Sequence, residues 1–163
     1  MDHDVIQSAT ALRYVILALQ RQGNRRLTSA LRGLNLTPSQ AEVLEVLAEF
    51  GPMKTGDVGT YLLCESGSPS RILDTLAAKG LSIRSHPVDD RRATIHSVTA
   101  AGRDTLHRLN EVEHDFISSF AHDLEEVVPG PDQIREIIRT LTQLVRDPTL
   151  RGALARRFPG LEG

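Results

Sequence analysis

The 163-residue sequence has almost no cysteine and no long apolar run. Its one cysteine, Cys64, excludes an intramolecular disulfide and suits a reducing compartment. No apolar run approaches the ~20 residues that cross a bilayer. The acidic start, with Asp2 and Asp4, is unlike the basic start of a signal peptide. We therefore expect a cytoplasmic protein with no membrane partner.

Aromatic residues are also scarce, at 4% of the chain, and Trp is absent. Leu, Ile, Val and Ala must then fill the core, which favours helices over an all-β sandwich. At this length one domain buries a real core without disulfides or metals, so we expect residues 1–163 to form a single domain. Nucleophile elbow, phosphate loop and His-Glu-x-x-His motifs are missing. We predict that the chain is not an enzyme, with no catalytic residues and no cofactor.

Acidic and basic residues are nearly balanced over the whole chain. The formal net charge is −2, whereas DNA-binding domains are often basic. The distribution is uneven, however: residues 66–103 carry six basic groups against three aspartates, and residues 36–65 carry one lysine against five acids. The basic middle block permits contact with a polyanion without specifying it.

Long amphipathic stripes at both ends of the sequence predict long helices. Apolar residues recur every three or four positions along residues 5–19, 106–124 and 134–144. We expect Gly23 to interrupt the first stripe. Because these stripes are large for so small a domain, we predict that residues 1–35 and 104–163 are dimerisation helices. The apolar residues expected at the dimer interface are Val5, Leu12, Ile16, Phe116, Phe120, Ile137 and Leu141.

The middle of the sequence predicts three short helices and then a hairpin. Thr37 caps the first helix, and Gln40 completes a capping box. A second, weak helix begins at Thr55 or Gly56 and carries Val58, Tyr61 and Leu62, and a third helix ends at Lys79. Period-two alternation predicts strands at 81–86 and 93–98.

This order of elements is that of a winged helix-turn-helix over residues 36–103. The fold class we predict is mainly α, with a small β-hairpin wing and long N- and C-terminal helices. A helix of this length fits the DNA major groove, and a hairpin beside it can reach the minor groove.

The third helix carries the residues that we expect to contact DNA. Arg71 can grip a guanine or a phosphate, and its alternative is to be a solvated surface arginine. Ser66 is equally suited to capping the helix. Asp74 would repel phosphates unless it is paired or accepts from a cytosine. The predicted recognition-helix contacts are Ser66, Gly67, Ser68, Ser70 and Arg71, and Thr37, Lys54 and Thr55 are further candidates for phosphate contact.

Four motifs in sequence order resemble those of the MarR family of bacterial regulators. Residues 36–40 (LTPSQ) open the first short helix, and residues 80–81 (GL) follow the third. Residues 89–92 (DDRR) match the tip of the wing, and residues 98–103 (VTAAGR) open the next helix. The resemblance covers residues 34–105 in motif detail.

The resemblance implies a homodimer with interleaved terminal helices, bound to double-stranded DNA at a pseudo-palindromic operator. In the family, a wing arginine enters the minor groove and an aspartate orients it, a pattern that Arg91 and Asp89 match. Arg92 would add a backbone contact or an ion pair. The alternative for this segment is an ordinary polar loop.

The resemblance further implies a repressor that a small aromatic or phenolic effector releases from DNA. The effector would bind between the dimer helices and the winged domain, and the candidate pocket residues are Tyr14, Arg84 and His86.

Two other readings of the same scaffold stay open: a redox- or metal-responsive switch, and a protein-interaction module that does not bind DNA. Cys64 lies in an apolar stretch, and a buried thiol without nearby cations should be inert. His107, His114 and His122 recur too far apart along one predicted helix to share a metal ion. We expect no metal site.

Overall fold

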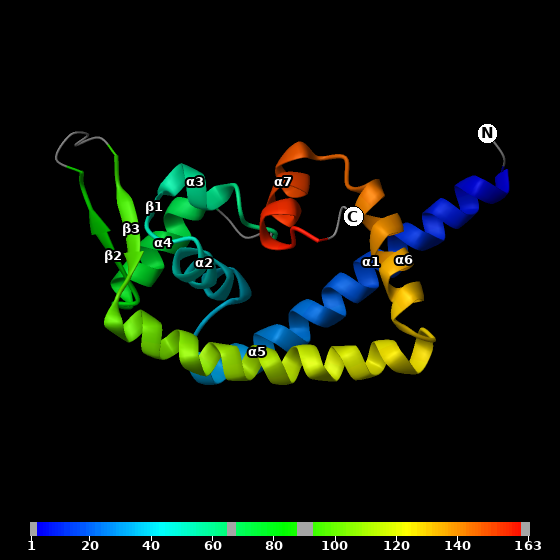
Figure 1. Ribbon diagram of the computed structural model, residues 1–163, viewed down its shortest axis with the longest axis horizontal. Coiled ribbons are helices and arrows are strands. Elements are labelled where there is room, and N and C mark those ends of the chain that lie inside the picture. Colours follow the sequence, from blue (N-terminus) through cyan, green and yellow to red (C-terminus); the bar gives the residue numbers. More distant parts are fainter. Residues whose placement is uncertain (1–2, 65–67, 88–92, 161–163) are drawn as a thin grey trace.

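The computed structural model describes residues 3–64, 68–87 and 93–160 (Figure 1). It is mainly helical and carries one small antiparallel sheet, as predicted. The helices are α1 (His3–Ala30), the short 3-10 helix η1 (Leu31–Leu34), α2 (Pro38–Glu49), α3 (Thr55–Gly59), α4 (Pro69–Ala78), α5 (Ala100–Val127), α6 (Pro131–Leu144) and α7 (Pro148–Arg157). The strands are β1 (Met53–Lys54), β2 (Ser82–Ser85) and β3 (Ile95–Val98).

The winged lobe, formed by α2, α3, α4 and the sheet, lies at one end of the molecule (Figure 1). Helix α5 leaves this lobe and passes the C-terminal part of α1, where Arg26 bonds to Asp123 and Ser119 of α5, both at 2.7 Å. Helix α6 returns beside α1, and α7 lies between α6 and the winged lobe (Figure 1). The lobe and the long helices are therefore joined through both α5 and α7.

The core belongs to the winged lobe and to the parts of η1 and α5 beneath it. Its fully buried side chains include Leu31, Leu44, Leu73, Leu76 and Leu109. Along the described parts of α1 and α6 no residue is buried. The long helices at the other end therefore present their apolar stripes to solvent within a single chain.

The start of α2 forms as the sequence predicts. The Thr37 hydroxyl accepts from the Gln40 backbone N–H at 3.3 Å, and the Gln40 side chain accepts from the Thr37 N–H at 3.3 Å. This reciprocal capping box satisfies two N–H groups that have no partner inside the helix.

Three details add to the prediction or differ from it. The helix α1 continues through Gly23, where we expected the apolar stripe to be interrupted, because a glycine inside a helix costs only about 1 kcal/mol. The wing gains a third strand: β1 pairs with β3, in the sheet order β1-β3-β2. Helix α3 ends at Gly59, so Tyr61 lies in the following loop and packs on Phe50 with ring centroids 4.5 Å apart.

The junction between the wing and α5 is close-packed. A Cβ atom added at Gly102 would lie 2.1 Å from the Leu81 carbonyl oxygen and 2.7 Å from Val98 Cγ1. Thr99 caps α5 by accepting from the Gly102 N–H at 3.0 Å, and its hydroxyl donates to the Gly80 carbonyl at 2.6 Å. The end of α4 is thus tied directly to the start of α5.

Candidate nucleic-acid interface

Helix α4 has one buried apolar face and one exposed polar face. Ile72, Leu73 and Leu76 enter the core, while Ser70 and Arg71 are exposed. A recognition helix needs such a division, because the apolar face anchors the helix and the polar face is available for a groove of DNA.

The start of α4 corrects the expected cap. The N-cap residue is Ser68, not Ser66, because Pro69 occupies the first helical position, where its fixed φ and missing N–H are tolerated. Ser68 is exposed, and its hydroxyl makes no capping hydrogen bond among the residues described. Ser66 and Gly67 lie outside the described residues, as do the wing residues Asp89, Arg91 and Arg92.

The end of α4 is fixed to the start of α2. Lys79 donates through Nζ to the Asn35 carbonyl and to Gln40 Oε1, the latter at 2.8 Å. Gln40 therefore serves both the α2 cap and the C-terminus of α4. This arrangement fixes how the two helices cross.

Asp74 is paired, which resolves the alternatives that the sequence left open. Its carboxylate accepts from Arg84 of β2, so an ion pair joins α4 to the wing. Arg84 lies directly opposite His96 in the β2–β3 register. Both partners of the ion pair remain substantially exposed.

Thr55 and His96 meet at the base of the wing. His96 is 2% exposed, and its Nε2 lies 3.0 Å from Thr55 Oγ1. Burial lowers the pKa of His96, and the positive charge of Arg84 acts in the same direction. Half-buried Thr55 is therefore engaged inside the lobe, whereas Thr37 and Lys54, the other two candidates for phosphate contact, are exposed.

Of the three candidate pocket residues, the structure brings two together. Arg84 and His86 line a polar cavity of about 170 Å³ between α4 and the wing, and Tyr14 is not among its lining residues. Tyr14 is exposed on α1, and the Cζ atom of Arg13 lies 5.1 Å from the centroid of its ring.

A larger cavity, of about 570 Å³, lies between α1 and the winged lobe. Helix α1, the start of α2 and the loop after α3 form its walls. Its lining residues are Gln20, Asn24, Leu27, Thr28, Thr37, Pro38, Ser39, Leu63 and Cys64. We call it the α1–α2 cavity.

Cys64 is exposed, contrary to the expectation of a buried thiol. It is not remote from cations either, because the charge of Arg157 acts on it. Partial desolvation and the neighbouring Glu42 carboxyl nevertheless raise the pKa of Cys64 to about 12. The reactive thiolate is therefore disfavoured at neutral pH, for a different reason from the one expected.

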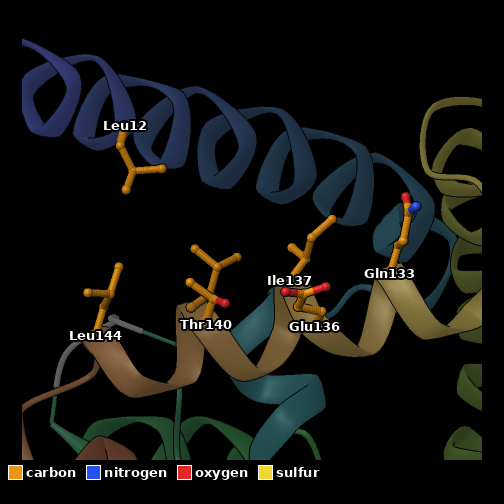
Figure 2. Close-up of a pocket in the computed structure, with 7 residues that line it drawn as sticks. Leu12, Gln133, Glu136, Ile137, Thr140 and Leu144 are labelled. Carbon is orange, nitrogen blue, oxygen red and sulfur yellow. The ribbon is translucent and has the colours of Figure 1, made fainter.

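The residues expected at a dimer interface lie on exposed or half-buried faces of the long helices. Leu12 and Ile16 on α1, Phe120 on α5, and Ile137 and Leu141 on α6 are exposed, as is Val5 near the start of α1, whereas Phe116 is half-buried. Figure 2 shows Leu12 pointing toward the side chains that α6 presents, among them Ile137 and Leu144. These side chains border an open cavity of about 440 Å³.

His107, His114 and His122 belong to no cluster of potential metal ligands among the residues described. Among the residues described, no three His, Cys, Asp or Glu side chains lie close enough to hold a metal ion. His122 lies 3.5 Å from Glu126, one turn further along α5. No helix in the described ranges has the length and apolar character to cross a membrane.

A buried acidic group in α2 was missed by the sequence analysis. Glu42 is 5% exposed, although it stands among the apolar residues of α2. It accepts from the N–H groups of Leu63 and Cys64 at 2.7 and 2.9 Å, and Arg157 of α7 contacts it at 2.7 Å. The available signal was its position between the core residues Ala41 and Val43, which makes burial of a carboxyl group conspicuous.

Comparison with known proteins agrees with this geometry. Residues 36–102 match the family model of the winged helix DNA-binding domain. Two transcriptional regulators of Bacillus subtilis are similar in sequence. YkoM is 31% identical over 44% of this chain and 47% of its own length. MhqR is 27% identical over 70% of this chain and 74% of its own length. The match thus spans about half of YkoM and about three quarters of MhqR.

The same fold occurs in solved structures. The organohalide-sensing regulator RdhR, in its 2,4-dichlorophenol bound form, has a TM-score of 0.72 at 20% identity, covering 83% of this chain and 78% of that one. BpsR of Bordetella bronchiseptica has a TM-score of 0.69 at 18% identity, covering 82% and 92%. MarR of E. coli has a TM-score of 0.62 at 21% identity, covering 82% and 96%.

The fold and the matched region define the class of this part of the chain: residues 36–102 form a winged helix domain of the DNA-binding type. Beyond that domain, the chain is similar in sequence to the HTH-type transcriptional regulator MhqR and similar in fold to a MarR-like regulator of Bacillus cereus, with a TM-score of 0.69 at 17% identity.

Proposed function

We propose that the protein is a homodimeric repressor that binds a pseudo-palindromic operator in the cytoplasm and is released by a small aromatic effector. The observation that carries the proposal is the division of α4. Its buried face fixes the helix in the lobe, and its exposed face presents Ser68, Ser70 and Arg71. Arginine is the side chain best suited to grip guanine or phosphate through two hydrogen bonds.

Dimerisation is supported by the apolar stripes that a single chain leaves uncovered. Helices α1 and α6 bury no residue among those described, yet they carry exposed Leu and Ile along one face. Exposed apolar faces of this extent mark interaction surfaces. A two-fold dimer would place two α4 helices about 34–36 Å apart, in successive major grooves.

The effector site that fits best is the α1–α2 cavity. At about 570 Å³ it lies within the usual range for small ligands, about 300–1,000 Å³. The cavity beside Arg84 and His86 has about 170 Å³, which is small for a ring compound. An aromatic effector is also supported by RdhR, described with bound 2,4-dichlorophenol, and by BpsR, whose DNA binding is regulated by 6-hydroxynicotinic acid.

Fluorescence anisotropy with DNA from the gene's own neighbourhood tests the proposal. Arg71→Ala and Arg91→Ala should each weaken specific binding and reduce its salt dependence, because each removes a cation from the DNA interface. Arg146→Ala, which removes an exposed arginine just before α7, is the matched control. Binding that both interface changes leave intact would refute the assigned contacts. A folded protein with no specific binding to any genomic fragment would favour a protein-interaction module.

The effector is tested on the same complex. Phenols and hydroxylated aromatic acids should release the unaltered protein from DNA. Asn24→Phe, which fills the α1–α2 cavity, should keep DNA binding and lose the release. Release that persists in this variant would place the effector elsewhere.

A further inference from the structure

Helix α7 reaches back to the segment that leads into the recognition helix. Two consecutive arginines near its C-terminal end make the contacts. Arg157 Nη1 lies 2.7 Å from Glu42 Oε1. Arg156 donates to the Thr60 carbonyl and lies over the Tyr61 ring, with its Cζ 5.0 Å from the centroid. In Figure 1 α7 stands beside α3, on the side of the lobe that faces α6.

Glu42 transmits the contact to the chain between α3 and α4. Its carboxyl oxygens accept the backbone N–H of Leu63 at 2.7 Å and that of Cys64 at 2.9 Å. A carboxyl group buried in this way is tolerated when it is paired and hydrogen-bonded. Arg157, with a side chain 18% exposed, supplies the pairing cation. Removing the arginine would leave Glu42 buried without its counter-ion.

The contacts converge on one short stretch of backbone. Thr60, Leu63 and Cys64 all lie between the end of α3 and the start of α4, and each has a backbone group held by α7 directly or through Glu42. Leu63 and Cys64 also form part of the wall of the α1–α2 cavity. The position of α7 therefore bears on where this stretch lies and on how α4 begins.

We propose that α7 acts as a C-terminal clamp, made of Arg156, Arg157 and Glu42, that positions the recognition helix for DNA. The arginines are positioning residues: they act on DNA affinity through residues 60–64 and not by touching DNA. The inference rests on the proposed contact of α4 with DNA. It assigns α7 a role distinct from dimerisation, because its arginines bind the winged lobe of their own chain.

The test combines hydrogen exchange with DNA affinity in the full-length protein. In Arg157→Ala, the amides of Leu63 and Cys64 should exchange at least ten-fold faster, and operator affinity should fall about five-fold or more. The Phe50 amide, bonded to the Val46 carbonyl at 3.0 Å, is the internal control and should not change. Arg157→Lys keeps a cation for Glu42 and should restore both properties in large part, and Arg146→Ala should alter neither.

Each other outcome decides against the clamp. Unchanged exchange at Leu63 and Cys64 would show that α7 does not hold the segment. Faster exchange with unchanged operator affinity would show that the segment does not position α4. If Arg157→Ala fails to fold, Arg156→Ala, which removes only the contacts to Thr60 and Tyr61, decides by the same two readouts. If α4 does not contact DNA at all, Arg71→Ala will leave operator affinity unchanged, and this result distinguishes failure of the proposed function from failure of the clamp.

Discussion

Gly102 lies where the first turn of α5 passes the end of the recognition helix. The added Cβ of Gly102→Ala would overlap the Leu81 carbonyl, 2.1 Å away, and backbone cannot rotate aside as a side chain can. We expect a loss of about 1–3 kcal/mol in the free energy of unfolding, measured by denaturant titration. Gly56→Ala, where a Cβ would meet nothing within 4 Å, should be neutral or slightly stabilising. Equal stability of both variants would refute this account of the junction.

Glu45 links pH to stability. Burial, followed by the hydrogen bond with Glu113, raises the pKa of Glu45 to about 9. Arg157 opposes the shift weakly, because its nearer contact is with Glu42 and its second nitrogen stays 3.6 Å from Glu45. At pH 7 the folded protein therefore holds this proton, whereas the unfolded chain, with a pKa near 4.5, releases it.

A raised carboxyl pKa contributes stability below the unfolded value, and this contribution is lost as pH rises toward the folded value. Glu45→Gln cannot ionise, so its stability relative to the unaltered protein should increase between pH 5 and pH 9, by about 1 kcal/mol or more. Thermal melts across this range give the difference. Glu49→Gln, at an exposed position on the same helix, should show no such trend. A constant difference for Glu45→Gln would contradict the shift.

Residue-level features were predictable where the interaction is local. The Thr37 capping box and the exposure of Arg71 follow from neighbours in sequence. The Glu42 pair with Arg157 does not, because the partners are 115 residues apart and periodicity within one helix says nothing about a distant arginine. The sequence left open whether Asp74 is paired for the same reason, because its partner Arg84 lies in the wing.

At the scale of elements, the pair between Asp74 and Arg84 ties the recognition helix to the wing. Asp74→Asn should release Arg84 for phosphate contact and remove a negative charge from the exposed side of α4. We expect tighter operator binding, with a salt dependence steeper by about one released counter-ion. Asp132→Asn breaks a comparable pair with Arg135 on α6 and should leave binding unchanged. Weaker binding by Asp74→Asn would mean that the pair orders the interface.

Long helices were easier to predict than the short strand β1. Strong apolar periodicity indicated α1, α5 and α6, and Pro69 and Gly80 mark the limits of α4. Strand β1 was missed because two residues carry no periodicity, and it is defined by pairing with β3 more than 40 residues later. Gly23 interrupts the apolar stripe without ending the helix, because the cost of one glycine is small in a helix of 28 residues.

At the scale of the whole molecule, the uncovered stripes of α1 and α6 predict that dimerisation and DNA binding fail together. Ile137 is 43% exposed in the single chain and borders the cavity shown in Figure 2. Ile137→Glu should shift the protein to a monomer in light scattering, because it places a charge in an apolar interface. Gln143→Glu adds the same charge at an exposed position of α6 and should remain a dimer.

Loss of the dimer should cost operator affinity about 100-fold or more, since the second half-site then no longer binds at the high effective concentration that a linked copy provides. A monomeric Ile137→Glu variant with undiminished affinity would show that one winged lobe suffices. The sequence indicated this arrangement through stripes too large for one small domain, but it did not indicate that α7 would return to the winged lobe. That contact depends on Arg156 and Arg157 meeting groups far away in the chain.

The most direct measurement of the central claim compares the operator with a version lengthened by five base pairs between its half-sites. Two α4 helices held by one dimer must face the same side of the DNA, and five base pairs rotate one half-site by about half a turn. We predict that anisotropy titration shows one dimer bound to the native spacing and an affinity loss of about 100-fold or more on the lengthened site. Equal affinity for both spacings would contradict a dimer that reads DNA through paired recognition helices.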